Sequence, residues 1–233
     1  MGDKIDEDKY KGTKPAWANC AKEDFRSLRQ TIWESNKRND KILQMYDDFA
    51  VHYKQASLIY GYVGHSNFAD VVTDVIIDKT ARILDAASGV GMVGEEMKKR
   101  GFINIDALDP SKTSLDLSKT LDVYTNFICE TLNEHRTQIQ DDFYDVVMMC
   151  ASLGLPGHVT ESCLPELIRI TKPGGFIILT VTEKSLFDFK DKLDAAIEEL
   201  TKKGLWEVLE TRWIGYMKGE DCEKAMVPII KVK

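Results

Sequence analysis

Three glycines, Gly89, Gly91 and Gly94, form the pattern G-x-G-x-x-G directly after the apolar run 81–86. Glycine lets a backbone approach a ligand closely because no Cβ stands in the way. The residues that follow have a helical pattern, and the N-terminus of a helix offers free N–H groups and a positive dipole end. The pattern therefore predicts a cofactor bound where a strand turns into a helix.

Asp109 is placed to contact the ribose of such a cofactor. It lies eighteen residues beyond Gly91, at the end of the apolar run 103–108, which we expect to be the second strand. Doubly wound folds carry an acidic side chain at this place, where it accepts hydrogen bonds from ribose hydroxyls. The alternative is that Asp109 only shapes the turn before Pro110.

Asp85 distinguishes two cofactor classes that both use a glycine loop after the first strand. It lies inside the run 81–86, four residues before Gly89. A carboxylate there repels the anionic pyrophosphate of NAD(P) or of a flavin dinucleotide. S-adenosylmethionine has no phosphate and carries a cationic sulfonium and a cationic α-ammonium, which a carboxylate attracts. The sequence therefore favours S-adenosylmethionine, and an NAD(P)-dependent reductase is the less favoured alternative.

Alternating strands and helices must position these residues. From residue 67 onward, short apolar runs alternate with helical patterns, and residues 206–216 and 226–233 are expected to form a terminal strand pair. Runs that are apolar throughout indicate a parallel sheet covered by helices on both faces. We therefore predict an α/β, doubly wound, Rossmann-like domain over residues 67–233.

The chain before this domain is expected to have two parts. Residues 1–20 are polar and are predicted to be a flexible N-terminus, whereas residues 21–66 are predicted to be a helical cap. Five aromatic side chains gather in the second half of the cap: Tyr46, Phe49, Tyr53, Tyr60 and Tyr62. They are expected either to pack on the core or to close as a lid over a ligand.

The stretch Ile83–Gly91, which reads I-L-D-A-A-S-G-V-G, resembles the first motif of class I S-adenosylmethionine-dependent methyltransferases. Cys129–Leu132 and the K-P-G-G turn at 172–175 are similar to later motifs, and the segment Tyr46–Tyr53 resembles the small-molecule branch of the family. With Gly157-His158-Val159 after the fourth strand, the chain most resembles the methyltransferase-like 27 (Williams–Beuren syndrome region) group over residues 45–233.

This resemblance implies a seven-stranded, mostly parallel sheet with an antiparallel C-terminal strand. It also implies S-adenosyl-L-methionine as the cofactor and S-adenosyl-L-homocysteine as its product. At Ala87 many family members have glycine, so we expect the loop to avoid a positive φ there. The residues that the resemblance assigns to the cofactor are Tyr46, Tyr53, Asp85, Ala87, Ser88, Gly89, Gly91, Asp109, Pro110, Ser111, Glu130, Thr131, Leu132, Cys150 and Ala151.

The methyl acceptor is expected to be a small molecule that is methylated on nitrogen or oxygen. Residues 150–153 read C-A-S-L, which differs from the [D/N]-P-P-[Y/F] motif of amino-methylating nucleic-acid enzymes. Aromatic side chains in the cap suit a closed pocket, and their faces attract cationic amines. A protein side chain is the second acceptor class, and a protein that binds the cofactor without turnover is a further alternative.

His158 is the candidate general base, because a histidine titrates near neutral pH and this one follows the fourth strand. The alternative is a histidine that only binds the backbone at a turn. A base is needed only where the accepting atom carries a proton that must leave.

Composition excludes several other function classes. The net charge is −7, whereas general affinity for nucleic acid needs clustered Lys and Arg. Apolar runs such as Phe176–Leu179 are too short to span a bilayer, and the N-terminus has no apolar signal core, so no membrane association is expected. The five cysteines form no C-x-x-C, so we expect reduced thiols in a cytoplasmic protein and no metal site.

Overall fold

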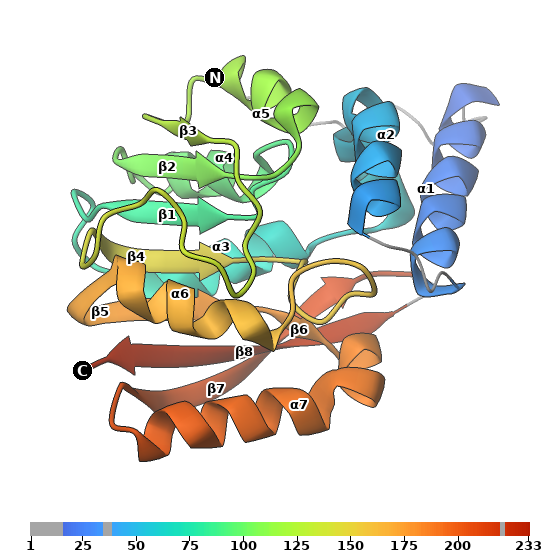
Figure 1. The fold of residues 1–233 in the computed structure, drawn as a ribbon. Helices are drawn as coiled ribbons and strands as arrows, with labels where there is room; N and C mark the ends of the chain where they lie inside the picture. Colours follow the sequence, from blue (N-terminus) through green and yellow to red (C-terminus); the bar gives the residue numbers. More distant parts are fainter. Residues whose placement is uncertain (1–15, 35–38, 220–221) are drawn as a thin grey trace.

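The computed structural model describes residues 16–34, 39–219 and 222–233 (Figure 1). Most of the expected flexible N-terminus lies outside the described residues, and the first helix begins at residue 16, before the expected start of the cap. The described helices are α1 (Ala16–Glu34), α2 (Asn39–Tyr60), α3 (Gly64–Val75), α4 (Met92–Lys99), α5 (Lys112–Lys119), α6 (Leu164–Ile170) and α7 (Glu183–Lys202).

A single twisted sheet organises the described residues. Its strands are β1 (Ile83–Ala86), β2 (Ile105–Leu108), β3 (Phe127–Ile128), β4 (Tyr144–Met149), β5 (Thr171–Leu179), β6 (Val181–Thr182), β7 (Trp206–Met217) and β8 (Glu223–Val232). The order is β3-β2-β1-β4-β5-β8, with β7 on the far side of β8. Strands β1 to β5 are parallel, whereas β8 runs antiparallel to both β5 and β7.

This topology confirms the predicted doubly wound, mostly parallel sheet with an antiparallel C-terminal strand. The described residues give eight strands where seven were expected, because the two-residue strand β6 follows β5 after Thr180. Strand β6 pairs with β8, as β5 does, so it extends the same edge of β8.

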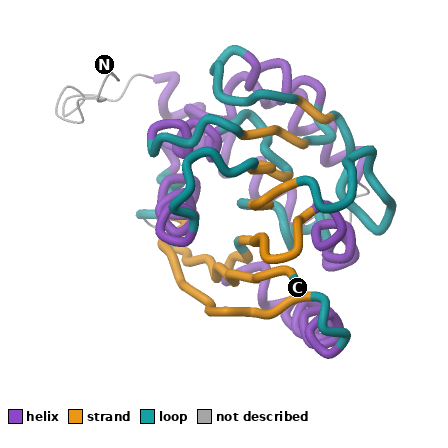
Figure 2. The backbone as a smooth tube through the Cα atoms, turned by 90° about the vertical axis from the view of Figure 1, so that its left-hand side faces the viewer, coloured by secondary structure: helices purple, strands orange, loops and turns teal. Residues whose placement is uncertain are grey.

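Helices cover both faces of the sheet, and each face has its own core (Figure 2). Ile83 of β1 packs in the core with α3, α4 and α5, whereas its neighbour Leu84 packs in the core with α6 and α7. Both side chains are fully buried. Because successive side chains of a strand point to opposite faces, a strand buried on both faces is largely apolar, and Asp85 is the one exception in β1. This is why β1 could be recognised from the sequence.

Helix α3 crosses residue 66, the expected boundary between the cap and the α/β domain. It contains Val71, Val72 and Val75, and β-branched residues favour strands. Tertiary packing overrides this preference, because Phe68 and Val72 are fully buried in the core and α3 lies against α4 and β7.

Helices α1 and α2 form a pair beside the sheet, at the end toward which β1, β2 and β4 point (Figure 1). Aromatic contacts join the pair: the ring of Phe25 lies 5.6 Å from that of Tyr53 and 5.4 Å from that of Tyr60. An ion pair of 2.8 Å between Arg29 of α1 and Glu223 of β8 joins the pair to the sheet. The cap therefore stands directly over the carboxyl ends of the parallel strands.

Candidate active site

A cavity of about 380 Å³ lies beyond the carboxyl ends of β1, β2 and β4, between these strands and helix α2. The loops after the strands, the start of α4 and one side of α2 form its wall. The expected site residues that line it are Tyr46, Tyr53, Asp85, Ala87, Ser88, Gly89, Asp109, Pro110, Ser111, Thr131, Leu132, Cys150, Ala151 and His158. Gly91 and Glu130 are absent from the wall.

The loop after β1 has left-handed backbone at three positions. Ala87, Gly89 and Gly91 have φ values of 56°, 53° and 88°. The expectation that the loop avoids a positive φ at Ala87 is therefore wrong, and the chain accepts this conformation at a cost of about 1 kcal/mol. Two backbone hydrogen bonds of 3.0 Å hold the turn, from Ser88 N to the Leu108 carbonyl and from Gly91 N to the Ser88 carbonyl.

The three glycines of the motif serve different purposes. A Cβ at Gly89 would meet no atom within 4 Å, so this residue faces open space and leaves the backbone accessible. A Cβ at Gly91 would lie 2.9 Å from the side chain of Leu121, and one at Gly94 would lie 2.4 Å from the ring of Tyr124. Gly91 and Gly94 therefore allow α4 to pack closely, which explains why Gly91 is not in the cavity wall.

Asp85 is a buried carboxyl group at the base of the loop. It is 1% exposed, and the phenol of Tyr124 donates a hydrogen bond of 2.6 Å to its Oδ2. Burial raises the pKa of Asp85 to about 7, the Tyr124 hydrogen bond opposes this shift, and the charge of Asp109 adds to it. A cationic group in the cavity would favour the ionised form of Asp85.

Asp109 follows β2 and joins two loops. Its Oδ2 accepts a hydrogen bond of 2.8 Å from Gly89 N, and its Oδ1 accepts one of 2.8 Å from Ser111 N. Asp109 therefore shapes the turn, as the alternative held, and it also anchors the glycine loop. Burial raises its pKa to about 6 and the charge of Asp47 contributes. Each carboxylate oxygen has a second lone pair, so Asp109 retains acceptor capacity toward the cavity.

The cap contacts this loop through Asp47 of α2. The hydroxyl of Ser111 donates a hydrogen bond of 2.5 Å to Oδ1 of Asp47 and accepts one of 2.9 Å from Ser114 N, which caps α5. One serine thus fixes the start of α5 and holds α2 against it.

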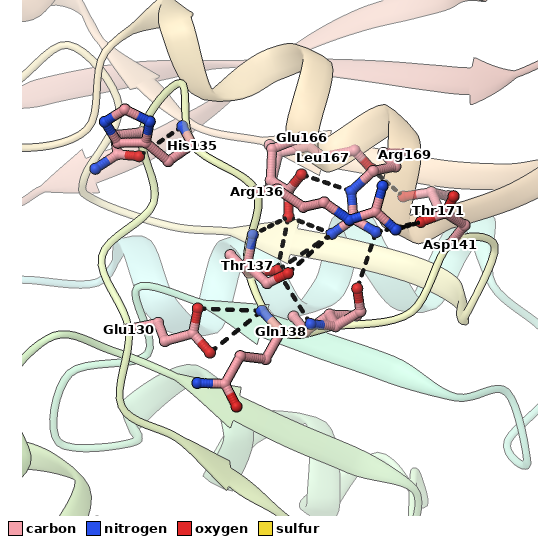
Figure 3. Close-up of polar contacts among 12 residues, drawn as sticks. Glu130, His135, Arg136, Thr137, Gln138, Asp141, Glu166, Leu167, Arg169 and Thr171 are labelled. Atoms are coloured by element: carbon pink, nitrogen blue, oxygen red, sulfur yellow. Dashed lines mark hydrogen bonds and ion pairs between the residues drawn. The ribbon is translucent and has the colours of Figure 1, made fainter.

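The loop between β3 and β4 supplies Thr131 and Leu132 to the wall, and a polar network holds this loop in place (Figure 3). Glu166 of α6 accepts hydrogen bonds of 2.8 Å from Thr137 N and 2.6 Å from Thr137 Oγ1. Arg169 donates to both oxygens of Glu166, at 2.5 and 2.7 Å. The loop is thereby attached to α6 on the opposite face of the sheet from α4.

Glu130 belongs to this loop but turns away from the cavity. Its carboxylate accepts a hydrogen bond of 3.2 Å from Gln138 N (Figure 3). Glu130 borders a separate groove beside β3. Glu130 was expected among the cofactor-binding residues, but it does not line the cavity.

The chain leaves β4 through a second left-handed alanine. Ala151 has φ 64°, and its N–H donates a hydrogen bond of 2.8 Å to the hydroxyl of Thr180. Cys150 is 7% exposed, and burial raises its pKa to about 12, so its thiol stays protonated. The phenol of Tyr62 lies 3.5 Å from this sulfur. Cys150 is therefore a neutral wall residue rather than a nucleophile.

His158 lies between the loop after β4 and the cap. Its Nδ1 is 2.9 Å from the carbonyl oxygen of Pro156, and its Nε2 is 2.9 Å from the phenol oxygen of Tyr46. A carbonyl only accepts, so Nδ1 carries the proton. Burial lowers the pKa of His158, so the ring is neutral and Nε2 accepts a hydrogen bond from Tyr46. The histidine binds a backbone carbonyl, as the alternative held, and also contacts the cap.

Several wall residues were not expected. Tyr62 had been noted only as part of the aromatic cap, and Ser152 only as part of the segment after the fourth strand. The wall residues outside the expected set are Ile42, Leu43, Ala50, Tyr62, Val90, Met92, Val93, Leu108, Ser114, Ser152, Gly157 and Val159. Most are apolar and give no chemical signal in a sequence.

The wall fits S-adenosylmethionine, the cofactor implied by the sequence. Asp85 and Asp109 place two carboxyl groups in the wall, which suits a ligand that carries cationic groups and hydroxyl donors, and the described wall contains no Lys or Arg. The hydroxyls of Ser88 and Ser152 are buried there without a hydrogen-bond partner among the described residues. Buried polar groups are nearly always bonded, so unbonded hydroxyls in a cavity indicate a polar ligand.

Within residues 16–34, 39–219 and 222–233, His, Cys, Asp and Glu side chains do not gather in a group able to hold a metal ion. None of the helices in these segments is long and apolar enough to cross a membrane.

Comparison with known sequences identifies relatives of the chain. A sequence profile of the methyltransferase domain matches residues 83–175. The human protein methyltransferase-like protein 27 is 30% identical over 170 residues, which cover 72% of this chain and 69% of that protein. Malonyl-[acyl-carrier protein] O-methyltransferase of Buchnera aphidicola is 29% identical over 153 residues, which cover 64% of this chain and 58% of that enzyme.

A solved structure shows the same fold. The TehB-like SAM-dependent methyltransferase from Corynebacterium glutamicum has a TM-score of 0.58 at 16% sequence identity, and the similarity covers 81% of this chain and 98% of that one. At this identity the match concerns the fold alone.

Proposed function

The chain belongs to the class I S-adenosylmethionine-dependent methyltransferases, and from this membership we propose that it methylates nitrogen or oxygen of a small molecule enclosed beneath the cap. The observation that carries the proposal is the position of α2, whose Tyr46 and Tyr53 line the same cavity as Cys150 and Ala151. An acceptor held between them is shielded from water, which favours displacement at a sulfonium methyl.

A second, smaller hollow supports an acceptor beside the cofactor. It shares Tyr46, Tyr53, Tyr62 and Ala151 with the main cavity and extends toward the ion pair of Arg29. Its wall is otherwise largely aromatic and aliphatic, and its volume of about 40 Å³ would take one small group of an acceptor that lies mainly in the larger cavity. The name of the Buchnera relative, malonyl-[acyl-carrier protein] O-methyltransferase, supports oxygen as one accepting atom.

Tyr46 and His158 are proposed to remove a proton from the acceptor where it has one to lose. S-adenosylmethionine supplies an activated methyl group when bound. As the new bond to the methyl forms, the proton of the accepting atom passes to the phenol oxygen of Tyr46, and the phenol proton passes to Nε2 of His158, 2.9 Å away. His158 ends the step as an imidazolium and later releases the proton to solvent. Tyr46 keeps the same protonation state throughout.

Transfer of a labelled methyl group tests the acceptor class. The protein is incubated with methyl-labelled S-adenosylmethionine and a cell extract separated into small-molecule, protein and nucleic-acid fractions. We expect label in the small-molecule fraction, and we expect Asp109→Ala to remove it while the exposed control Asp78→Ala does not. Label that enters only the protein fraction would replace this proposal with methylation of a protein side chain.

A binding protein without turnover remains the second candidate, because the unbonded hydroxyls of Ser88 and Ser152 support cofactor binding and say nothing of transfer. Binding of S-adenosylhomocysteine with no labelled product in any fraction would favour it. NADH binding in the absence of S-adenosylhomocysteine binding would favour a reductase. A cytoplasmic site of action is also proposed, supported by the four described cysteines, which are all free thiols.

A further inference from the structure

Strand β7 lies at one edge of the sheet, and most of its outer side is unpaired (Figure 1). Among the described residues its partner strand is β8, and a single bridge joins Met217, at the end of β7, to Tyr62. The strand has twelve residues. An edge strand of this length presents backbone N–H and C=O groups to which a further strand can bond.

Two observations place the backbone groups of Thr211 on the free side of β7. Opposite residues of an antiparallel pair exchange either two hydrogen bonds or none, and Pro228, opposite Thr211, has no N–H to exchange. The carbonyl of Gly215, in the same unbroken register, accepts a hydrogen bond of 2.7 Å from the side chain of Asn67 in α3. Because the direction of these groups alternates along a strand, those of Thr211, Trp213 and Gly215 point away from β8.

The exposed part of this edge has a symmetric sequence. Leu209 is 46% exposed and Trp213 is 52% exposed, so two large apolar side chains lie in solvent. Between them lie Glu210 and Arg212, which form an ion pair of 2.6 Å with each other, and Thr211 is at the centre. The segment reads L-E-T-R-W, in which an acid and a base, and then two apolar residues, flank the threonine.

The segment is complementary to itself when it is reversed. In an antiparallel pair of two copies centred on Thr211, Leu209 lies opposite Trp213 of the second copy. Glu210 likewise lies opposite Arg212 of the second copy. Apolar pairs and pairs of opposite charge are the cross-strand combinations that stabilise a sheet. Two-fold symmetry makes each pair occur twice.

We propose that two copies of this chain associate through antiparallel pairing of their β7 strands, centred on Thr211. The two sheets then form one continuous sheet, and the backbone groups of Thr211 and Trp213 bond to those of the second copy. Each copy uses its only β7 edge, so association through this edge ends at the dimer. Residues 209–213 do not line the active-site cavity, so the contact leaves the cavity wall unchanged.

Reversal of single charges tests both the dimer and its register. Sedimentation of the full chain over a series of concentrations is expected to show a dimer whose fraction rises with concentration. Glu210→Arg places like charges opposite each other twice, and Arg212→Glu does the same with acids. Each variant is therefore expected to raise the dissociation constant of the dimer about ten-fold.

A mixture of the two variants restores the charge pairs. In a dimer of one Glu210→Arg chain and one Arg212→Glu chain, every base lies opposite an acid, so native mass spectrometry is expected to show this heterodimer at concentrations where each variant alone is monomeric. Glu134→Arg is the matched control, because it makes the same charge change at an exposed position after β3, the strand at the other end of the sheet. It should leave the dimer unchanged.

The melting temperature of each variant, measured at a concentration where the wild type is monomeric, is expected to stay near that of the wild type. The substitutions remove only largely exposed ion pairs, so weaker association does not come from misfolding. A wild-type protein that is monomeric at every concentration would overturn the proposal and would mean that the register shift beside Leu209 and the charges protect this edge. Single variants that dimerise as the wild type does, or a mixture that stays monomeric, would also overturn it.

Discussion

The phenol of Tyr46 donates a hydrogen bond of 2.9 Å to Nε2 of His158, so the cap and the loop after β4 are joined directly across the active-site cavity. The rings also meet edge to face, with centroids 5.3 Å apart. His158 can accept this bond because Nδ1 donates to the Pro156 carbonyl. His158, the candidate general base, is therefore also the residue of this loop to which Tyr46 of the cap is hydrogen-bonded.

Replacing Tyr46 with phenylalanine is expected to raise the pKa of His158. Burial lowers this pKa below its usual 6.5. A hydrogen bond from Tyr46 to Nε2 requires that nitrogen to be unprotonated and therefore favours the neutral ring. Without the phenol the neutral form loses a donor, so the pKa moves back toward 6.5. Titration of the His158 ring proton signals by NMR measures the change. Tyr53→Phe serves as the control, and an equal pKa in the wild type and in Tyr46→Phe would show that the phenol does not donate to Nε2.

Asp85→Asn is expected to stabilise the free protein more at alkaline than at acidic pH. The pKa of Asp85 is 3.8 in an unfolded chain and about 7 in the fold. Because folding raises the pKa of this carboxyl group, the group contributes stability that is fully present below about pH 4. This contribution to the free energy of unfolding is lost as the pH rises through about 7. Asparagine does not titrate, so the gain in melting temperature over the wild type grows from about pH 5 to about pH 8.

The same variant is expected to bind S-adenosylmethionine more weakly at about pH 8, where the wild-type carboxylate is ionised and attracts the cationic cofactor. Asp78→Asn, at an exposed loop position, is the control for both measurements. A stability gain that does not depend on pH would contradict the raised pKa.

Substitutions at Ala87 and Ala195 are expected to have opposite effects on the free energy of unfolding. Ala87 has a left-handed φ of 56°, and glycine adopts this conformation without strain. The strain relieved offsets the larger entropy that glycine loses on folding, so the free energy of unfolding of Ala87→Gly stays level or rises by about 0.5 kcal/mol. Glycine at Ala195, an exposed position inside α7, lowers stability by about 1 kcal/mol. Urea unfolding compares the two. Ala87→Gly that destabilises as much as Ala195→Gly would show that the alanine is not strained.

Glu166→Gln is expected to weaken cofactor binding although Glu166 lies outside the cavity. The carboxylate holds the loop of Thr131 through two hydrogen bonds from Thr137 and compensates Arg169 (Figure 3). Losing a charged acceptor is expected to lower the free energy of unfolding by about 2 kcal/mol and the affinity for S-adenosylhomocysteine several-fold. Glu198→Gln breaks only an exposed ion pair of α7 and should change neither quantity measurably. Unchanged affinity in Glu166→Gln would show that the wall does not depend on this network.

The parts of the site that could be predicted from sequence are those encoded locally. The glycine loop, Asp85 and Asp109 lie within short motifs at strand ends, and their spacing follows from the parallel fold. The contact of Tyr46 with His158 joins residues 112 positions apart, and no local pattern indicates it. The unbonded state of Ser152 is likewise a property of packing.

The error at Ala87 has a physical origin. Conformational preference indicated that an alanine would avoid a positive φ. In the fold, hydrogen bonds of the loop outweigh this preference, which amounts to about 1 kcal/mol per residue.

Residues 22–64 are predicted to form a mobile cap that becomes more ordered when the cofactor binds. The structure gives two reasons to expect coupling. Asp47 of α2 bonds to Ser111 beside Asp109, and Tyr46 bonds to His158, so the cap contacts both sides of the cavity. Ligand that fills the cavity adds contacts to α2, and a closed cap excludes water from the reaction. The competing interpretation is a cap that packs permanently on the core.

Hydrogen exchange across Tyr46–Gly64 distinguishes the two interpretations of the cap. A mobile cap exchanges quickly in the free protein and is protected by S-adenosylhomocysteine, whereas a permanently packed helix is protected equally in both states. Tyr53→Ala removes a ring that lies 5.6 Å from Phe25 and 5.8 Å from Tyr46, so under the lid interpretation it weakens cofactor binding and reduces the ligand-induced protection. Phe187→Ala, which alters an 89% exposed ring on α7, is the control and should leave both unchanged. Identical exchange with and without ligand would establish the cap as part of the core.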